Sequence, residues 1–228
     1  MRVFPIIVLL SLFSRQAVIA QSDTTALLNE IESRLKKGSI DISAILMDKN
    51  YLPLHPQTSF RELIKKYCTA STTTITADTE PGKKIKVLAS LKDENGKSIA
   101  GAVVYFYQTD AQGWYAADKP HVGGNSGDQR HARIFGYVKT DASGKFEIHT
   151  VKPSGYPQSD LPAHIHVEVH DLPSYQPIVT EFLFDDDERL VGTIRANAQQ
   201  SLFMIAKPEK ANPPFQQQFS YTITLQKN

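Results

Sequence analysis

The fold of this chain is decided by the stretch Pro162-Ala163-His164-Ile165-His166-Val167-Glu168-Val169-His170. Apolar and polar residues alternate along it, which is the pattern of a half-buried β-strand. Because the side chains of a strand point alternately to its two faces, His164 and His166 are predicted to project side by side from the polar face. Two imidazoles at this spacing can bind one metal ion, and a strand with a merely polar outer face is the alternative interpretation.

A tyrosine precedes this strand on a predicted turn, Lys152-Pro153-Ser154-Gly155-Tyr156-Pro157. Gly155 and Pro157 are residues that favour turns, and they flank Tyr156 on both sides. A tyrosine in such a place is usually a loop aromatic. Together with the histidine pair downstream, it becomes a candidate functional residue.

The chain from residue 71 to 228 has the pattern of an all-β domain. Three Asp-x-x-Gly turns begin at Asp93, Asp110 and Asp141, and each suits a short loop in which glycine takes the left-handed conformation. Seven segments rich in β-branched and aromatic residues are predicted strands: Lys84–Leu91, Ala102–Thr109, Ile134–Thr140, Lys145–Val151, Ala163–His170, Ile178–Phe184 and Phe219–Leu225. Short strands at this spacing indicate an antiparallel β-sandwich.

The residues before the sandwich are predicted to form an export signal and a helical or extended arm. Residues 1–20 combine a positive Arg2, an apolar core and small residues before a cleavage site after Ala20. Residues 21–70 form the arm, with a first short helix over Asp23–Lys37 and a second one opened by a capping box of Ser59 and Glu62. The mature protein is therefore expected to be secreted or periplasmic.

Composition excludes several other classes of protein. The 228 residues carry 25 basic and 24 acidic side chains, so no charged field points to nucleic acid. The apolar run near the N-terminus is too short for an ordinary membrane span. The single cysteine, Cys68, allows no internal disulfide, so a metal site would use nitrogen and oxygen ligands. The acidic run Asp185–Glu188 is interpreted as a solvated loop, with a hard-cation site as the alternative.

Four motifs in a fixed order resemble the intradiol ring-cleavage dioxygenases, the catechol and protocatechuate 3,4-dioxygenase superfamily. The first is Gln108-Thr109-Asp110-Ala111-Gln112-Gly113-Trp114-Tyr115, and the second is Thr140-Asp141-Ala142-Ser143-Gly144. The third is Lys152–Pro157 and the fourth is Pro162–His166. The histidine pair alone is a weak signal, whereas the four motifs in this order are specific. The resemblance covers roughly residues 75–190.

The resemblance implies a β-sandwich that binds one non-haem ferric ion per chain. Tyr115 and His164 would be equatorial ligands, and Tyr156 and His166 axial ones. An isolated phenol has a pKa near ~10, so the tyrosines bind as phenolates because the metal lowers that value. The implied reaction cleaves a small aromatic diol with O2 between its two hydroxyl-bearing carbons, to give a muconic acid-type product. Tyr115 and Tyr156 would be the catalytic residues, and the chain could assemble as a homo-oligomer.

Three positions depart from the pattern of this family. Its members usually carry an arginine three residues before the first histidine, where this chain has Leu161. Phe135 replaces another frequent arginine, and Glu181 replaces a glutamine. In the long segment before Ile134, Arg130, His131 or Arg133 would supply positive charge to the site or lie at the surface. The alternatives to the enzyme are a non-catalytic β-sandwich binding module and a copper or zinc protein built on His164 and His166.

Overall fold

The computed structural model describes residues 24–116 and 132–228, which belong to two compact units, Met1–Asp41 and Ile42–Asn228. In the first unit a helix spans residues 24–36, within the predicted Asp23–Lys37. It ends where Gly38 takes a φ of +64° and donates its N–H to the carbonyl of Leu35. The predicted export signal, residues 1–20, lies outside the described residues, and no helix of the described part is long and apolar enough to cross a membrane.

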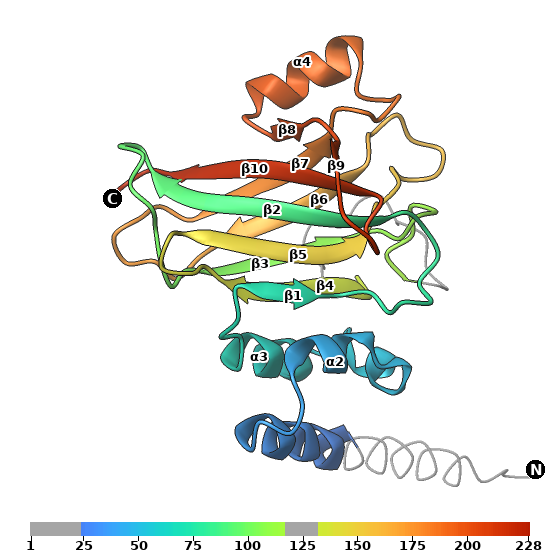
Figure 1. Cartoon of the computed structure of the whole chain (residues 1–228), viewed down its shortest axis with the longest axis vertical. Helices are drawn as coiled ribbons and strands as arrows, with labels where there is room; N and C mark the ends of the chain where they lie inside the picture. Colours follow the sequence, from blue (N-terminus) through green and yellow to red (C-terminus); the bar gives the residue numbers. More distant parts are fainter. Residues whose placement is uncertain (1–23, 117–131) are drawn as a thin grey trace, which may run out of the picture. The chain divides into compact units, whose positions relative to one another are not determined.

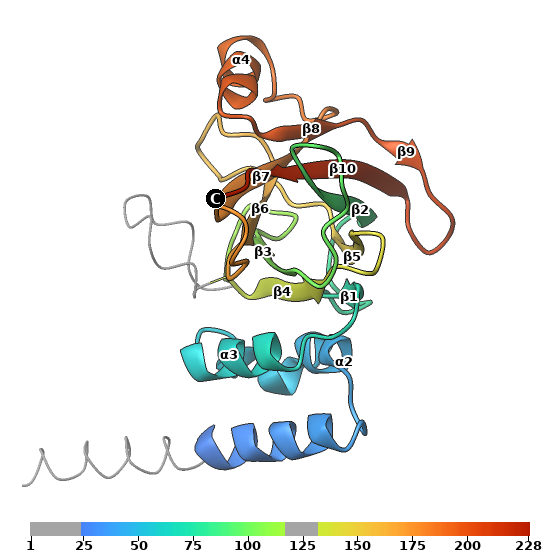
Figure 2. The same cartoon turned by 90° about the vertical axis from the view of Figure 1, so that its left-hand side faces the viewer.

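The second unit contains two five-stranded sheets that face each other (Figures 1 and 2). The first sheet has the order β1-β5-β2-β10-β9, and the second has the order β4-β3-β6-β7-β8. Their bounds are β1 Thr72–Thr74, β2 Lys84–Asp93, β3 Val103–Gln108, β4 Ile134–Lys139, β5 Lys145–Val151, β6 His164–Val169, β7 Ile178–Phe184, β8 Met204–Ala206, β9 Glu209–Lys210 and β10 Gln217–Leu225. Each of the seven predicted strands therefore exists.

The two-layer sandwich agrees with the prediction, but its sheets are mixed, so the prediction of an antiparallel sandwich was wrong in strand direction. β1 pairs with β5 in parallel, β10 with β2, and β8 with β7, while the other five strand pairs are antiparallel. Parallel neighbours need a crossover connection instead of a hairpin. β10 joins β2 after the chain has built the other sheet, and β8 joins β7 after an intervening helix. Alternation of apolar residues reports the buried face of a strand and carries no signal for its direction.

The core lies between the inner faces of the two sheets. Phe182 of the second sheet stacks on Tyr221 of the first, with ring centroids 4.1 Å apart, and the Tyr221 hydroxyl donates to the carbonyl of Leu183. Phe184 meets Phe219 edge to face at 4.8 Å. Complete burial of one such side chain contributes about 1.5–3 kcal/mol. This packing joins the second sheet to the first, and the outer face of the second sheet carries the candidate site.

The remaining helices are α2 Ile42–Met47, the 3-10 helix η1 Lys49–Leu54, α3 Thr58–Lys66 and α4 Gly192–Gln200. α3 begins one residue before the predicted cap: Gln57 is its N-cap, no side chain caps it, and Ser59 lies inside the helix. The capping box of Ser59 and Glu62 was therefore a wrong prediction. α4 was not expected, and with β8 and β9 it lies between the predicted strands Ile178–Phe184 and Phe219–Leu225.

Candidate metal centre

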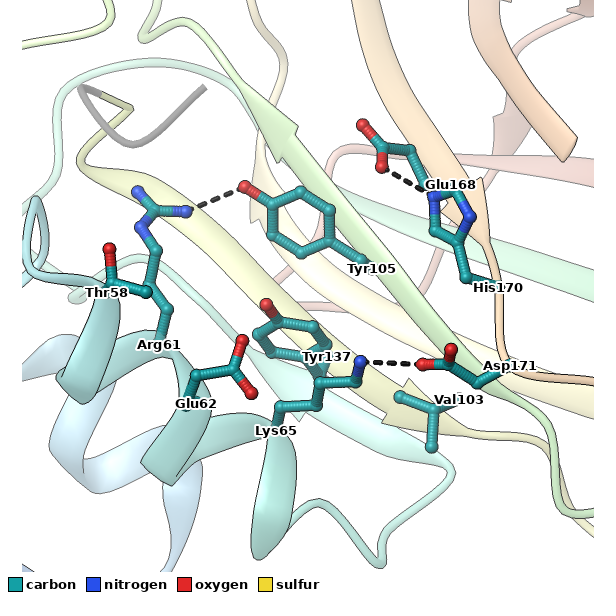
Figure 3. A pocket seen from close by; sticks show the side chains of 10 residues that line it. All are labelled: Thr58, Arg61, Glu62, Lys65, Val103, Tyr105, Tyr137, Glu168, His170 and Asp171. Atoms are coloured by element: carbon teal, nitrogen blue, oxygen red, sulfur yellow. Dashed lines mark hydrogen bonds and ion pairs between the residues drawn. The ribbon is translucent and has the colours of Figure 1, made fainter. Parts of the chain in front are cut away.

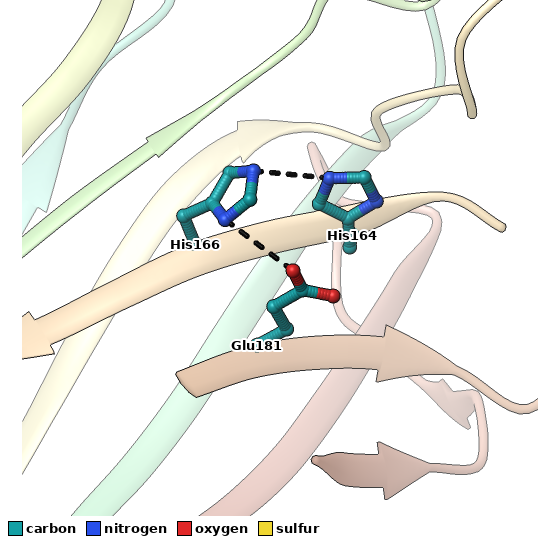
Figure 4. A group of neighbouring side chains, drawn as sticks. All are labelled: His164, His166 and Glu181. Carbon is teal, nitrogen blue, oxygen red and sulfur yellow. Dashed lines mark hydrogen bonds and ion pairs between the residues drawn. The ribbon is translucent and has the colours of Figure 1, made fainter. Parts of the chain in front are cut away.

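The histidine pair lies on the outer face of the second sheet, at the start of β6. The register pairs His166 with Tyr107 of β3 on one side and with Glu181 of β7 on the other, so these three side chains share a face with His164. The two Nε2 atoms of the histidines are 3.1 Å apart (Figure 4). The prediction that the alternation sets the two imidazoles side by side is confirmed.

Two docked turns bring the tyrosines to this face. In the first, the Asp110 carboxylate accepts from the N–H groups of Gln112 and Trp114, and Tyr115 follows directly. The second is the turn around Tyr156, and its Ser154 N–H donates to the Asp110 carbonyl at 3.0 Å. A Cβ atom on Gly113, whose φ is +87°, would overlap the carbonyl oxygen of Gly155. Glycine at 113 therefore allows the two turns to approach and the two tyrosines to meet.

Four side chains converge with their donor atoms in mutual contact: Tyr115, Tyr156, His164 and His166. The two phenol oxygens are 2.7 Å apart. The Tyr115 oxygen is 2.9 Å from Nε2 of His166, and the Tyr156 oxygen is 3.0 Å from Nε2 of His164 and 3.5 Å from Nε2 of His166. Atoms that bind one metal ion at about 2.0–2.2 Å lie roughly 3 Å from one another. The structure therefore brings together the four residues that the sequence singled out.

Backbone and carboxylate partners turn both imidazoles toward the cluster. Nδ1 of His164 lies 2.7 Å from the carbonyl oxygen of Pro162, which can only accept, so Nδ1 carries the hydrogen and Nε2 presents a lone pair. Nδ1 of His166 lies 3.5 Å from the carboxylate of Glu181 (Figure 4). Glu181 and the two histidines also form a group of three side chains that could hold a metal ion. Because Glu181 faces the ring edge away from the four converging atoms, it fits the role of an orienting partner better.

The cluster has more close contacts than protons to fill them. If each neutral phenol donates to one histidine, no hydrogen remains for the contact of 2.7 Å between the phenol oxygens or for that of 3.1 Å between the histidine nitrogens. The two phenol oxygens then face each other with lone pairs, and so do the two histidine nitrogens. A cation placed among the four atoms removes this conflict, because all four become its ligands. The donor set thus fits a metal ion.

Burial opposes ionisation of the two tyrosines in the protein alone. It raises the pKa of Tyr115, and the neighbouring Tyr156 raises it further. Burial likewise raises the pKa of Tyr156. Phenolate at this site therefore requires a strong nearby positive charge, which a multivalent metal ion would supply.

Charged residues around the site have structural partners. Arg133 donates to both oxygens of Glu80, at 2.8 and 2.6 Å, and to Asp110 at 3.1 Å, so it braces the turn before Tyr115. Arg133 is therefore paired and part-buried and does not lie free at the surface, while Arg130 and His131 lie outside the described residues. Leu161 is half exposed and brings no charge to the site.

The acidic run after β7 is a loop, as predicted, with Asp186 and Glu188 exposed, but three of its four carboxylates have protein partners. Asp185 pairs with Arg195 at 2.7 Å and Asp186 with Lys152 at 2.6 Å. Asp187 accepts from the backbone of Ala163 and of Arg189, at 2.8 Å each. The contact between Asp187 and Ala163 could not be predicted from the local sequence, because this contact depends on how β7 pairs with β6.

A separate pocket lies between α3 and the other end of the same sheet face (Figure 3). Several of its polar groups pair within it: Arg61 donates to the Tyr105 hydroxyl, Lys65 pairs with Asp171, and His170 pairs with Glu168. It shares no residue with the four converging side chains. The pairs made by Arg61 and Lys65 tie α3 to this face of the sheet and to the end of β6.

Comparison with known proteins places the chain in a family. A family model described as Dioxygenase matches residues 60–227. Chlorocatechol 1,2-dioxygenase of Rhodococcus opacus is 28% identical over 128 residues, which cover 49% of this chain and 47% of that enzyme. Catechol 1,2-dioxygenase 1 of Acinetobacter lwoffii is 32% identical over 109 residues, which cover 41% of this chain and 33% of that enzyme. The chain thus spans less than half the length of these two relatives.

A solved structure of an enzyme with a similar name has a similar fold. The crystal structure of 3-chlorocatechol 1,2-dioxygenase from Rhodococcus opacus matches with a TM-score of 0.55 at 18% identity, over 96% of each chain. The family model covers most of the present chain, including all four motifs. The chain belongs to the intradiol ring-cleavage dioxygenase family.

Proposed function

We propose that this chain is a non-haem ferric dioxygenase that cleaves a catechol-type ring between its two hydroxyl-bearing carbons. The observation that carries the proposal is the convergence of two phenol oxygens and two imidazole nitrogens with too few protons for their contacts. Membership of the intradiol family, and the catechol and chlorocatechol enzymes among its relatives, support the reaction and the substrate class. O2 is the second substrate, and a muconic acid-type compound is the product.

Tyr115, Tyr156, His164 and His166 would hold the ferric ion. Two phenolates offset two of its three positive charges, which matters in a buried site where uncompensated charge is costly. Hard anionic oxygen donors favour ferric over ferrous iron. When bound, the ferric ion supplies Lewis acidity that draws electron density from a catecholate and makes its ring reactive toward O2.

The protein's own part in the reaction is to place the ligands and to move protons. The Tyr156 oxygen contacts Tyr115 and both histidines, and it lies on a turn, whereas the two histidines are fixed on a strand. Tyr156, which contacts the other three donor atoms, would accept a proton from the incoming catechol at its phenolate oxygen. The histidines keep their Nε2 atoms toward the site, because their Nδ1 atoms face Pro162 and Glu181.

One observation favours a second candidate function, a non-catalytic binding module on the same scaffold. Leu161 stands where family members usually carry an arginine, and its side chain is 50% exposed. Arg133, the described arginine nearest to Tyr115 in sequence, is bound to Glu80 and Asp110. A binding module would retain the scaffold and fail to turn over any catechol.

We further propose that the chain is exported, with cleavage after Ala20, and acts in the periplasm or outside the cell. The basis is the pattern of residues 1–20. An oxidising compartment would suit a site that works in the ferric state. Edman sequencing of the secreted protein should begin at Gln21, and retention of residues 1–20 on the mature protein would contradict export by this route.

The activity is tested with the full mature chain loaded with ferric iron. Oxygen uptake is followed with catechol, chlorocatechols and larger catechols, and the product is identified by mass spectrometry after reaction under ¹⁸O₂. We expect one ring-opened diacid that contains both labelled oxygen atoms. Iron-loaded protein that takes up no oxygen with any of these diols would favour the binding module.

A further inference from the structure

Asp187 lies three residues beyond the end of β7, and the fold returns it to the start of β6. β7 runs antiparallel to β6, and Leu183 pairs with His164, so the chain that leaves β7 emerges beside the residues that precede His164. There the Asp187 carboxylate accepts a hydrogen bond of 2.8 Å from the N–H of Ala163. Its other oxygen accepts from the N–H of Arg189, also at 2.8 Å. The carboxylate is thus held at both oxygens.

The peptide group between Pro162 and Ala163 connects Asp187 with His164. Its N–H donates to Asp187, and its carbonyl oxygen accepts from Nδ1 of His164 at 2.7 Å. In a trans peptide these two groups point in opposite directions, so carboxylate, peptide and imidazole form one chain of hydrogen bonds. Hydrogen bonds in such a chain polarise one another. The negative charge of Asp187 therefore makes the Pro162 oxygen a stronger acceptor for the imidazole N–H.

We propose that Asp187 is a positioning residue for His164 and acts through this peptide group. Carboxylates that accept from the Nδ1–H of a metal-binding histidine fix its tautomer and raise the basicity of its other nitrogen. Glu181 faces His166 directly, at 3.5 Å, and Asp187 serves His164 with one peptide inserted. Each histidine of the cluster then has its own carboxylate. The proposal rests on the proposed metal site, of which it names a supporting residue.

Arg189 completes the support for the same segment. Its guanidinium donates to the carbonyls of Tyr156 and Leu161, at 3.3 Å each, and thus ties together the two ends of the loop between the candidate ligands Tyr156 and His164. A Cβ atom on Gly155 would overlap the guanidinium, so glycine at that position leaves room for Arg189. Because Asp187 fixes the backbone of Arg189, loss of the carboxylate would loosen both ends of this loop.

The test replaces Asp187 by asparagine, which keeps the shape and removes the charge. Asp185→Asn is the matched control, because Asp185 belongs to the same loop and pairs with Arg195. Zinc affinity of the mature protein is measured by competition with a chelator, which needs neither ferric iron nor activity. We expect Asp187→Asn to bind zinc about 10–100-fold more weakly and Asp185→Asn to bind it like the wild type. Equal affinities in all three proteins would overturn the proposal.

A second measurement uses the metal-free protein and a readout that a merely structural role would leave unchanged. ¹⁵N NMR should find His164 protonated at Nδ1 in the wild type, and in Asp187→Asn the Ala163 amide and the His164 Nδ1 signals should both move. A wild type protonated at Nε2 of His164 would refute the proposal even if the variant does not fold. A wild type that binds no metal while these signals move would contradict the proposed function and leave the role of Asp187 supported.

Discussion

The ring of Tyr107 stacks on the imidazole of His166, with centroids 4.4 Å apart and planes inclined by 14°. The two residues are direct cross-strand neighbours of β3 and β6, so the sheet register itself produces the stack. Because Glu181 lies 3.5 Å from Nδ1 of His166, longer than a good hydrogen bond, the stack is the firmer constraint on this ring.

The first prediction concerns this stack. Tyr107→Phe keeps the ring, so it should bind zinc with the affinity of the wild type. Tyr107→Ala frees the imidazole of His166 and leaves a cavity, so we expect a loss of about 3 kcal/mol in the free energy of unfolding and about tenfold weaker zinc binding. Chelator competition and urea unfolding measure the two effects. Equal zinc affinity of the phenylalanine and alanine variants would show that the stack does not position His166.

The second prediction concerns the histidine pair. His164→Ala and His166→Ala each delete one of the two imidazole nitrogens in the cluster. His170 continues the polar face, but its ring is paired with Glu168 at 2.9 Å and cannot substitute without leaving it. We expect each variant to lose iron during purification, as measured by elemental analysis, while His170→Ala retains it. A double variant of His164 and His166 with full iron content would refute the assignment.

The third prediction concerns Leu161. Its side chain is half exposed, so an arginine fits there without disturbing the core. One preorganised cationic donor near developing substrate charge is worth about 10²–10³ in rate. Turnover of unsubstituted catechol by the wild type should therefore be slow, and Leu161→Arg should be faster by up to that factor. Leu161→Gln, similar in length and neutral, is the control and should gain little.

An iron-loaded Leu161→Arg variant that is no faster than the wild type would show that another residue fills the role or that unsubstituted catechol is a poor model of the substrate. The comparison then moves to larger, more apolar catechols. There the binding energy of remote groups can contribute to the rate.

The sequence predicts the strands well because their signal is local. Lys145–Val151 and Ile178–Phe184 match β5 and β7 from end to end. The three-residue β8 and the two-residue β9 were not predicted, because segments this short show no alternation of apolar residues. Helix α4 was not predicted because Ala198 is its only buried residue. The relative direction of paired strands was not predicted, because it depends on the connections between strands and not on the local sequence pattern.

In the candidate site, too, the residues with a local sequence signal were predicted and those placed by strand pairing were not. His164 and His166 follow from alternation along one strand, and the two tyrosines follow from family motifs. The contacts that orient the histidines could not be predicted from local sequence, because Glu181 and Asp187 reach them through the pairing of β7 with β6. Glu181 was visible in the sequence as a departure from the family pattern. Asp187 was hidden in an acidic run whose local pattern points to solvent or to a cation.

The fourth prediction concerns pH and His55. This histidine is 2% exposed and donates from Nδ1 to the carbonyl of Arg133, while its Nε2 is buried without a hydrogen-bond partner in the described part of the chain. Burial lowers the pKa of His55 from 6.5 to about 4. The unfolded chain therefore binds a proton near pH 6.5 that the folded chain resists until about pH 4. Stability should fall as pH falls through this window.

The size of this effect is about 3 kcal/mol, since each pKa unit corresponds to about 1.4 kcal/mol. The free energy of unfolding of the wild type, measured in urea between pH 7 and 4, is compared with that of His55→Asn, which keeps a donor for the Arg133 carbonyl. The variant should lose less stability than the wild type over this range. Parallel pH curves for the two proteins would contradict the assignment to His55.

The fifth prediction is the central one: Tyr115, Tyr156, His164 and His166 together bind one ferric ion. The most direct measurement is the visible absorption spectrum of the mature protein after loading with ferric iron, with the iron content determined on the same sample. We expect one iron per chain and a tyrosinate-to-iron charge-transfer band. Tyr115→Phe and Tyr156→Phe should each shift or weaken this band while the far-ultraviolet circular dichroism stays the same. A colourless protein without iron, or a band unchanged in both phenylalanine variants, would contradict the account.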